Sequence, residues 1–402
     1  MNQTLRKTAF PFLSAALLMY GCNKSNLKST PSGQTETSVV HHKYGLTPVS
    51  DDEMKNVPVF SPALLRSGAS DLGLTYSGTL PSSYLLVTPS VRDQGQIGSC
   101  TGFCGSEANE ILEYYKSVNP TSVTGITSTS AAISAINSNK FASPTSYFGS
   151  SGALAPLFLY YVERVLIQKQ RITVDNGANM VNIGQALQGL TNNTGTGAAL
   201  TKNGVTYKGE CTENLYAYPS TLDASGYNVA TSSSTQYRTA PSSAAIANAP
   251  SFSLATQSGS TTSSGTTTAH GYYYIAGTGD ATEVTNVKTA IANNKPVLMG
   301  FTVYDNSNYT VFEGLNTTSY IYNPLTNGKI TSGLSALGGH AVPLVGYFDD
   351  GTAATSATGG GYFIVQNSWG TPWGYNGHFL LPYSVLKNSS VVGNNNLYVM
   401  LL

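Results

Sequence analysis

Two parts of this chain, about 240 residues apart, carry side chains that complement one another chemically. The early part, 94–103, contains a Gln six residues before Cys100. The late part contains His340 after paired glycines, and then the run Asn-Ser-Trp-Gly within 366–374. Together they supply a thiol, an imidazole and two side-chain amides, which are the groups that a thiol acyl-transfer site uses. We therefore expect the early and late halves of the chain to meet at one site.

The order and spacing of these residues resemble the papain family of cysteine peptidases. The residues that carry the resemblance are, in chain order, Gln94, Cys100, His340 and Asn367. The family's run Asn-Ser-Trp-Gly-x-x-Trp-Gly-x-x-Gly is matched from Asn367 to Gly377, and both Trp residues of the chain fall in it. The resemblance covers roughly 85–402. It implies an α+β, papain-like two-lobe fold, with a helical N-terminal lobe, a β-barrel-like C-terminal lobe and the active-site cleft between them.

The resemblance also implies a role for each residue, with no metal and no cofactor. Cys100 is the nucleophile, and a helix N-terminus and an adjacent imidazolium are expected to lower the pKa of its thiol. His340 acts as general base and acid. The oxyanion hole consists of the Gln94 side chain and the backbone N–H of Cys100. Asn367 orients the imidazole through its amide oxygen, and Trp369 shields that hydrogen bond from water.

The chain departs from the family pattern at several positions. Thr101 replaces the Trp that usually follows the nucleophile, so we expect a smaller wall on the leaving-group side of the cleft. Ile97 replaces the usual bridging Cys, which leaves two alternatives for Cys104: a bond to Cys211, or burial in the helix as a small apolar side chain. No acidic residue is clearly placed to select a basic side chain next to the scissile bond.

The N-terminus predicts export. Residues 1–21 combine a basic start with a short apolar stretch, 10–20, and resemble a lipoprotein signal peptide cleaved before Cys22, whose thiol would be acylated. The alternative is an ordinary signal peptide or an anchor in which Cys22 is incidental. Asn23 is not the acidic residue that retains lipoproteins at the inner membrane. We therefore expect attachment at the bacterial outer membrane or cell surface, or else a periplasmic or secreted protein.

Composition narrows the class of partner. Lys+Arg and Asp+Glu are both 20, so the formal net charge is zero and there is no electrostatic footprint for nucleic acid. Charged residues make up only 10% of the chain, which suits an exported protein. We expect protein or peptide substrates as partners and membrane contact through the lipid anchor alone. The oligomeric state is not readable from sequence.

The pattern along the chain predicts a tether or lead-in over 22–80 and a papain-like peptidase domain over 81–402. Within the domain we expect a helical lobe at about 95–215, a Ser/Thr-rich insertion at 220–269 and a β-rich lobe at about 270–402. The tether lacks the charged, periodic helix of long inhibitory pro-regions. Apolar periodicity predicts helices at 103–115, 155–166, 183–190 and 284–293, strands at 295–304, 341–347, 361–366 and 377–381, and insertion loops at 117–153 and 349–360. The segments 175–178 (Asp-Asn-Gly-Ala) and 209–219 resemble two further landmarks of the family.

The leading hypothesis is a cysteine-type endopeptidase that hydrolyses peptide bonds through an acyl-thioester on Cys100. One alternative is an exopeptidase or transpeptidase variant in which an insertion blocks one end of the cleft; product lengths would distinguish it. The other is a catalytically idle papain-like fold that serves as a surface peptide-binding module. The chain retains all the catalytic residue types, which favours the enzyme over the idle fold.

Overall fold

The computed structural model describes residues 42–65, 79–194, 197–255 and 271–402, all of which belong to one compact unit, Val40–Leu402. The predicted signal peptide and Cys22 lie outside the described residues. No helix within the described ranges is both long enough and apolar enough to cross a bilayer.

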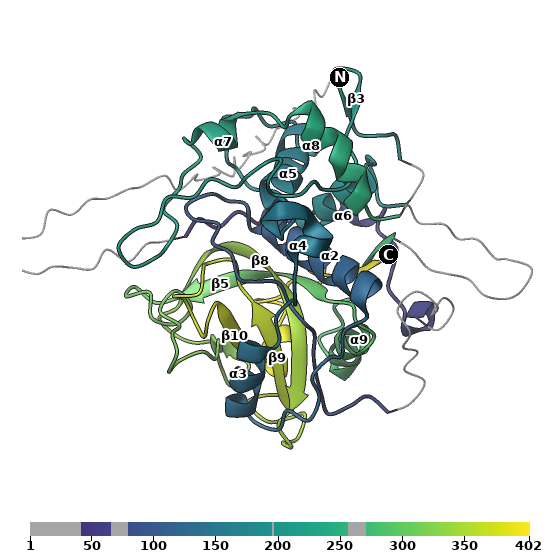
Figure 1. Cartoon of the computed structure of the whole chain (residues 1–402). Helices are drawn as coiled ribbons and strands as arrows, with labels where there is room; N and C mark the ends of the chain where they lie inside the picture. Colours follow the sequence, from purple (N-terminus) through teal and green to yellow (C-terminus); the bar gives the residue numbers. More distant parts are fainter. Residues whose placement is uncertain (1–41, 66–78, 195–196, 256–270) are drawn as a thin grey trace, which may run out of the picture. The chain divides into compact units, whose positions relative to one another are not determined.

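The first half of the described chain is mainly helical (Figure 1). Its longest helix, α2 (Cys100–Val118), begins at Cys100 and ends where Asn119 takes a left-handed conformation. The other helices and helical turns of this half are α1 (Asp51–Met54), η1 (Pro62–Leu65), α3 (Thr129–Ser138), α4 (Thr145–Phe148), η2 (Gly149–Ser151), α5 (Pro156–Tyr161), the π-helix η3 (Val162–Ile167), α6 (Met180–Gln188), α7 (Thr235–Arg238), α8 (Ser243–Asn248) and η4 (Ala249–Phe252). The predicted loop at 117–153 therefore contains short helices.

The second half forms a seven-stranded antiparallel sheet in the order β10-β9-β8-β5-β11-β4, with β1 paired to β8. Its strands are β1 (Ser83–Leu85), β4 (Gly271–Tyr274), β5 (Val297–Asp305), β8 (Ser335–Asp349), β9 (Gly361–Gln366), β10 (His378–Pro382) and β11 (Leu397–Leu401). Two small hairpins pair β2 (Thr201–Lys202) with β3 (Val205–Thr206) and β6 (Leu325–Thr326) with β7 (Lys329–Ile330). The end strands β10 and β4 do not pair in the described residues, so the predicted barrel-like lobe is an open sheet.

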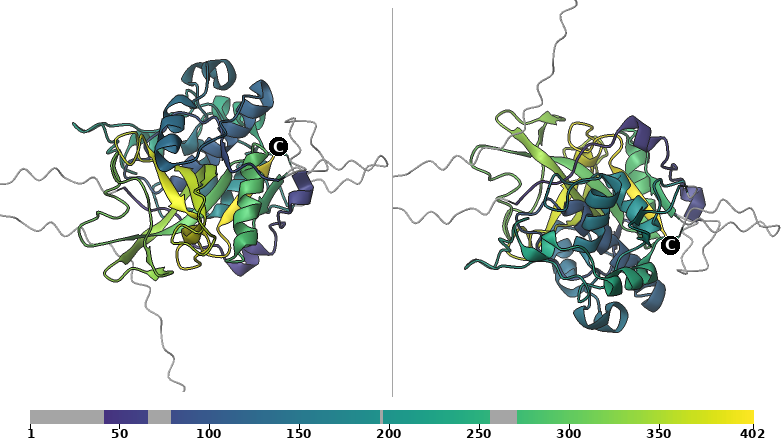
Figure 2. Two further views of the ribbon diagram at one scale, coloured as in Figure 1. Left: turned by 90° about the horizontal axis from the view of Figure 1, so that it is seen from below. Right: turned by 90° about the horizontal axis from the view of Figure 1, so that it is seen from above.

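Helices and strands segregate, as expected for an α+β fold. In Figure 1, α2, α5, α6 and α8 lie together above the sheet, and in Figure 2, from above, the helices overlie the strands. Helix α2 contacts β8 on one side and α5 and α6 on the other. Helix α9 (Ala281–Ala292) packs against β8, β5 and β1. The α2–β8 contact is what brings the early and late parts of the chain together.

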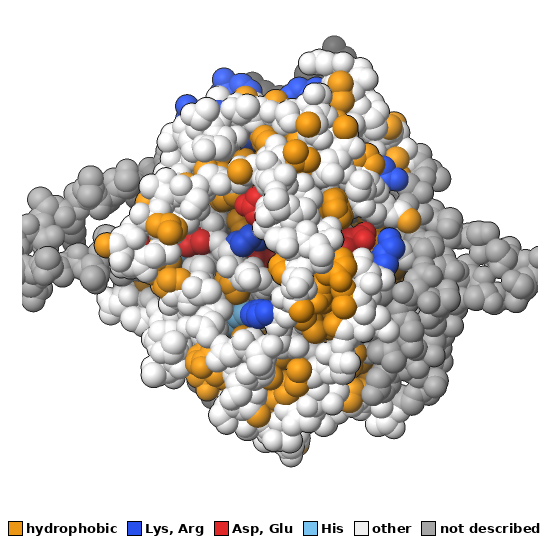
Figure 3. All heavy atoms as spheres, in the orientation of Figure 1, with side chains coloured by type: hydrophobic (Ala, Val, Ile, Leu, Met, Phe, Trp, Pro, Cys, Tyr) orange, Lys and Arg blue, Asp and Glu red, His pale blue; other side chains and the backbone are white. Residues whose placement is uncertain are grey.

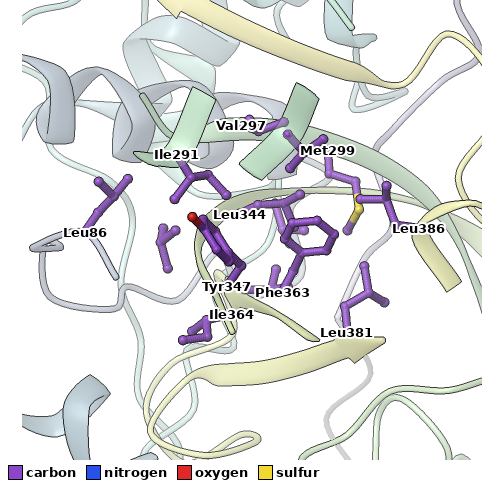
Figure 4. Close-up of a cluster of buried hydrophobic side chains, with 14 of the residues drawn as sticks. Leu86, Ile291, Val297, Met299, Leu344, Tyr347, Phe363, Ile364, Leu381 and Leu386 are labelled. Carbon is purple, nitrogen blue, oxygen red and sulfur yellow. The ribbon is translucent and has the colours of Figure 1, made fainter. Parts of the chain in front are cut away.

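Two apolar cores stabilise this arrangement. One fills the space between the sheet and α9, where Ile291 lies with strand residues such as Val297, Leu344 and Phe363 (Figure 4). The other lies among α2, α5 and α6 and also takes side chains from β4, β5 and β11. Each fully buried large apolar side chain contributes roughly 1.5–3 kcal/mol, so the two cores hold α2 and β8 firmly in register.

The periodicity located most of the elements but not all of them. The strand predicted at 361–366 is confirmed as β9, and the helix at 284–293 as α9, one turn earlier in its start. The helix predicted at 155–166 divides into α5 and a π-helix. Strands β1, β4 and β11 were not predicted. The surface is poor in charge, as the face drawn in Figure 3 illustrates.

Candidate active site

Cys100 is the first residue of α2, and its side chain is fully buried. Ser99, at the N-cap, makes no side-chain capping bond; its hydroxyl lies 2.5 Å from the hydroxyl of Tyr218. Tyr218 also donates to the backbone oxygen of Gln94 at 2.8 Å. The landmark segment 209–219 thus fixes the loop that leads into the nucleophile. The uncapped first turn of the helix leaves its N–H groups and its positive dipole end next to Cys100.

His340 lies in the middle of β8, paired with Phe301 of β5, and is fully buried. Its Nε2 is 2.7 Å from Oδ1 of Asn367, which follows β9 directly. The other ring nitrogen, Nδ1, has no hydrogen-bond partner in the described part of the chain. The backbone of Ala341, the residue after His340, lies close enough to the Cys100 thiol to favour its thiolate form. His340 and Asn367 are therefore in direct contact, and the strand that carries His340 packs against α2, the helix that begins at Cys100.

Gln94 is held from both lobes. Its backbone N–H donates to the backbone oxygen of Ser368 at 2.8 Å, and its side-chain oxygen accepts from the Ser368 hydroxyl at 2.7 Å. This leaves the amide NH₂ free to point the other way, where Nε2 donates to the oxygens of Ile97 at 2.8 Å and Lys43 at 3.0 Å. Ser368 was not predicted to have a role; in the structure it fixes the orientation of the Gln94 amide.

Trp369 covers the His–Asn pair. Its ring is fully buried, lies 5.1 Å from the His340 ring and meets Phe312 and Trp373 at 5.1 and 5.3 Å. On its remaining side it stacks on the His42 ring at 4.4 Å with an interplanar angle of 7°. His42 in turn approaches Asp93 at 3.2 Å. The aromatic cover therefore extends into the segment before the peptidase domain.

Residues 42–47, inside the predicted tether, run through the site in extended conformation. Leu46 donates its N–H to Gly339 at 3.0 Å, and Thr47 donates to Ala178 at 2.8 Å. Ala178 returns a bond to the oxygen of Gly45 at 3.0 Å. The segment is thus bonded to the strand that carries His340 on one side and to the landmark segment 175–178 on the other. We call residues 42–47 the cleft segment.

Two side chains of the cleft segment, those of Tyr44 and Leu46, contact the β-rich lobe. Tyr44 donates to Glu313 at 2.7 Å and packs at 5.8 Å from the Trp369 ring. Leu46 is directed toward β5, where one of its methyl carbons would lie 2.8 Å from a Cβ built on Gly300. Gly300 therefore provides a pocket that a larger residue would fill.

Gly45 lies at the narrowest point. Its backbone lies close enough to the Cys100 thiol to favour the thiolate form. A Cβ on Gly45 would lie 1.8 Å from the backbone oxygen of Gly98, and a Cβ on Gly177 would lie 1.8 Å from the oxygen of Gly45. The cleft segment therefore passes through a slot, between Gly98 and Gly177, that is only as wide as a main chain.

Burial shifts the pKa of the Cys100 thiol in the direction opposite to the one we predicted, and it also shifts the pKa of His340. Burial raises the pKa of the Cys100 thiol from 9.0 to about 12, and the backbone hydrogen bonds from Gly45 and Ala341 offset this only in part. Burial lowers the pKa of His340 from 6.5 to about 4, against the opposing effect of Asn367. Because both groups are fully buried, the uncharged thiol and imidazole are favoured over the charged pair in this conformation.

Two further expectations have structural outcomes. Thr101 does not line the cleft: it is buried and donates to Glu163 of η3 at 2.6 Å, because it points into the helical lobe. Cys104 and Cys211 are both free and buried, so no bond joins them. Within the described ranges, no group of three or more His, Cys, Asp or Glu side chains is arranged to hold a metal ion.

A buried thiol at a helix N-terminus, beside a His–Asn pair and an amide donor, is the arrangement used by thiol-dependent acyl-transfer enzymes. The chain belongs to the papain family of cysteine proteases: the model of that family matches residues 192–399, which include His340 and Asn367 and begin after Cys100.

Individual relatives match over shorter stretches. Cathepsin B-like cysteine proteinase 5 of Caenorhabditis elegans is 35% identical over 116 residues, which are 28% of this chain and 27% of the relative. A peptidase C1-like protein of Acanthamoeba polyphaga mimivirus is 26% identical over 111 residues, 28% of this chain and 30% of the relative. Both matches span less than a third of the relative's length.

Among solved structures, xylellain, a cysteine protease from Xylella fastidiosa, resembles the chain over 90% of its length and 97% of that protein's, with a TM-score of 0.53 and 21% identity. This likeness shows that the two share the papain-like fold.

Proposed function

We propose that this protein is a cysteine endopeptidase that hydrolyses peptide bonds through an acyl-thioester on Cys100. The observation that carries the proposal is the meeting of the Cys100 thiol, at the first residue of α2, with the β8 strand that bears His340 in its 2.7 Å contact with Asn367. Family membership supports the same reaction class.

In the proposed first step, His340 takes the proton of the Cys100 thiol, the sulfur forms a bond to the substrate carbonyl carbon, and the electron pair of the C=O double bond moves to the oxygen, which takes the negative charge. His340 then donates a proton to the leaving nitrogen, the C–N bond breaks and the amine departs. In the second step, His340 takes a proton from water, the resulting hydroxide attacks the thioester, and the C–S bond breaks to release the acid and the thiol. Asn367 keeps the imidazole aligned during both steps.

Gln94 is the proposed donor to the carbonyl oxygen as its charge develops, together with the backbone N–H of Cys100. Support comes from the Lys43 carbonyl oxygen, which accepts from Gln94 Nε2 at 3.0 Å and stands where a substrate carbonyl would be bound. Ser368 holds the amide in that orientation in advance, which is how such donors stabilise a transition state most effectively.

The cleft segment is proposed to keep this enzyme latent. A substrate would need the Gln94 donor, the slot between Gly98 and Gly177 and the strand edge at Gly339, and the cleft segment uses all three. It also keeps Cys100 and His340 uncharged, which explains how a peptide bond can remain intact beside the nucleophile. This role is fulfilled by an extended segment, without the helical pro-region that the sequence lacks.

Export and lipid attachment through Cys22 are also proposals, and they rest on the sequence alone. Replacing Cys22 by Ala should move the protein from the membrane to the soluble fraction of an expressing bacterium. If the variant partitions as the wild type does, lipidation at Cys22 is wrong.

The test of the proposed reaction is the intact mass of the reduced full chain after treatment with an epoxysuccinyl inhibitor of papain-like enzymes, beside Cys100→Ala. A single adduct on the wild type and none on the variant is expected. The lengths of the products from a defined peptide then distinguish endopeptidase from exopeptidase action. A folded, reduced chain that forms no adduct even after the cleft segment is displaced would refute the assignment.

A further inference from the structure

An ion pair inside the cleft joins the cleft segment to the wall of the slot. Lys43 Nζ lies 2.7 Å from Oδ2 of Asp175 and 2.5 Å from the Asp175 backbone oxygen. The two partners differ in exposure: the side chain of Asp175 is 3% exposed, whereas that of Lys43 is 42% exposed. The Asp175 carboxylate is therefore part of the buried wall of the slot, whereas the Lys43 ammonium approaches it from the cleft.

Asp175 is fixed from behind by groups of the enzyme itself. The backbone N–H of Gly98 donates to its two carboxylate oxygens at 3.2 and 3.1 Å, and the Tyr160 hydroxyl donates to Oδ1 at 2.6 Å. These bonds remain when the cleft segment leaves, so the carboxylate keeps its position. Lys43 is the only basic side chain within salt-bridge distance of it in the described residues.

Other charges near Asp175 are already engaged. The guanidinium of Arg164 lies over the rings of Tyr160 and Tyr237 and donates to the backbone oxygens of Ile172 and Val174. It therefore makes no ion pair with Asp175. When Lys43 leaves, the carboxylate loses the one cation that pairs with it.

The position of Asp175 relative to the nucleophile is set by the slot. Gly98, which bonds to the carboxylate, lies two residues before Cys100, and Gly177 lies two residues after Asp175. Both glycines contact Gly45, the residue whose backbone lies beside the thiol. A peptide held at the thiol thus has the Asp175 carboxylate beside it, within reach of a long side chain.

We propose that Asp175 selects substrates with Lys or Arg at the residue whose carbonyl is attacked by Cys100, and that Lys43 is the chain's own occupant of this position on the wall. The inference rests on the proposed peptidase function and adds its substrate class. An ammonium or guanidinium that reaches Asp175 from the cleft restores the ion pair that Lys43 vacates, whereas an uncharged side chain leaves a desolvated carboxylate without a counter-charge.

The test uses the full chain with Gly45→Ala, because the added methyl group collides with Gly98 and displaces the cleft segment from the slot. Two fluorogenic peptides are compared that differ only in Arg or citrulline at the acylated residue; citrulline has nearly the same shape as Arg and no charge. Leu precedes this residue in both peptides, so that they differ only in the charge of the acylated residue. The expected kcat/KM is at least about tenfold higher for the Arg peptide, because only its charge pairs with the carboxylate.

Asp175→Asn, added to this background, should reduce the Arg-to-citrulline ratio to about one to threefold, since the amide still accepts hydrogen bonds but has no charge. The ratio cancels any general loss of activity. Asp175→Ser is the second variant, with thermal melting as the check on folding. Asp223→Asn is the matched control: its carboxylate also accepts two backbone N–H groups, from Ser225 and Tyr227, and its substitution should leave the ratio unchanged.

The outcomes distinguish failure of the Asp175 proposal from failure of the proposed peptidase function. Equal hydrolysis of both peptides by the Gly45→Ala chain overturns the role of Asp175 but not the peptidase function. This comparison is decisive even if the Asp175 variants fail to fold. A high ratio that persists in Asp175→Asn or Asp175→Ser also overturns it, because the charge is then recognised elsewhere. Failure to hydrolyse either peptide, with no adduct on Cys100, refutes the peptidase function and the inference together.

Discussion

Gly45→Ala should open the cleft. The added Cβ would lie 1.8 Å from the Gly98 oxygen, 2.3 Å from its carbonyl carbon and 2.6 Å from its Cα, all of them backbone atoms that have little freedom to move. Real Cβ atoms essentially never approach closer than 3.0 Å, so the segment must retreat by more than an ångström. Hydrogen bonds that now measure 3.0 Å would then exceed the distance at which they are effective.

The size of the effect follows from the bonds that are lost. Retreat of the Gly45 region removes the bond from Ala178 to Gly45 and the bond from Gln94 to Lys43, and it weakens the contact of Gly45 with the Cys100 thiol. Two to three such bonds at about 1 kcal/mol each shift the closed–open equilibrium by about 2–3 kcal/mol. This corresponds to about a 30- to 150-fold rise in the open population.

The assay is the second-order rate of Cys100 modification by an epoxysuccinyl inhibitor, followed by intact mass. While the closed state predominates, this rate is proportional to the open population, so the same 30- to 150-fold rise, about two orders of magnitude, is expected. Thr47→Ala is the matched control, since this residue contributes only its backbone N–H to the cleft. A change of less than twofold for Gly45→Ala, or equal acceleration by Thr47→Ala, would refute the reasoning.

Further predictions concern the site once it is open. Gln94→Ala should lower kcat by about 10²–10³ with little change in KM, because its donor acts on charge that develops only in the transition state; an equal rise in KM instead would contradict this. Ser368→Ala should reproduce part of that loss, and no loss would mean that Gln94 is oriented by other contacts. Asn367→Ala should cost up to about a hundredfold, less than His340→Ala, since misalignment is milder than removal of the base. Acid should open the cleft. The pKa of His340 is about 4 in the closed state and near its ordinary value of 6.5 when the imidazole is solvated, so protonation favours the open state. The closed state keeps its full advantage above pH 6.5 and loses it as the pH falls toward 4, and the ratio of open to closed molecules should rise about 30-fold by pH 5. Deuterium exchange of the amides of residues 42–47, corrected for the intrinsic effect of pH, measures this, and slower exchange at pH 5 would refute it.

Much of the fold was predictable because its elements are amphipathic or strongly apolar. Helix α9 and strand β9 combine clear periodicity with turn residues at their ends, so local sequence determines them. Strand β4 was not predicted because its Gly-Tyr-Tyr-Tyr run becomes a strand only through pairing with β11, which lies more than 120 residues later. The open sheet likewise depends on long-range pairing that periodicity does not specify.

The site was predictable where spacing is diagnostic and unpredictable where it depends on burial. The motifs located Gln94, Cys100, His340 and Asn367, but they could not indicate that a neighbouring segment covers them. Residues 42–47 have no helical period and no charge run, so nothing in their sequence distinguishes them from a tether. The direction of the Cys100 pKa shift was therefore wrong for this conformation, because desolvation by burial outweighs the backbone groups that favour the thiolate.

The stacking of His42 on Trp369 has a practical consequence for kinetics. The chain contains only two Trp residues, and they lie 5.3 Å apart in the same buried cluster. Their fluorescence therefore reports on one location, and departure of His42 would expose one face of one indole to solvent. Rapid-mixing experiments on the unlabelled protein could then measure how fast the segment leaves and returns, and whether that motion or bond cleavage limits turnover.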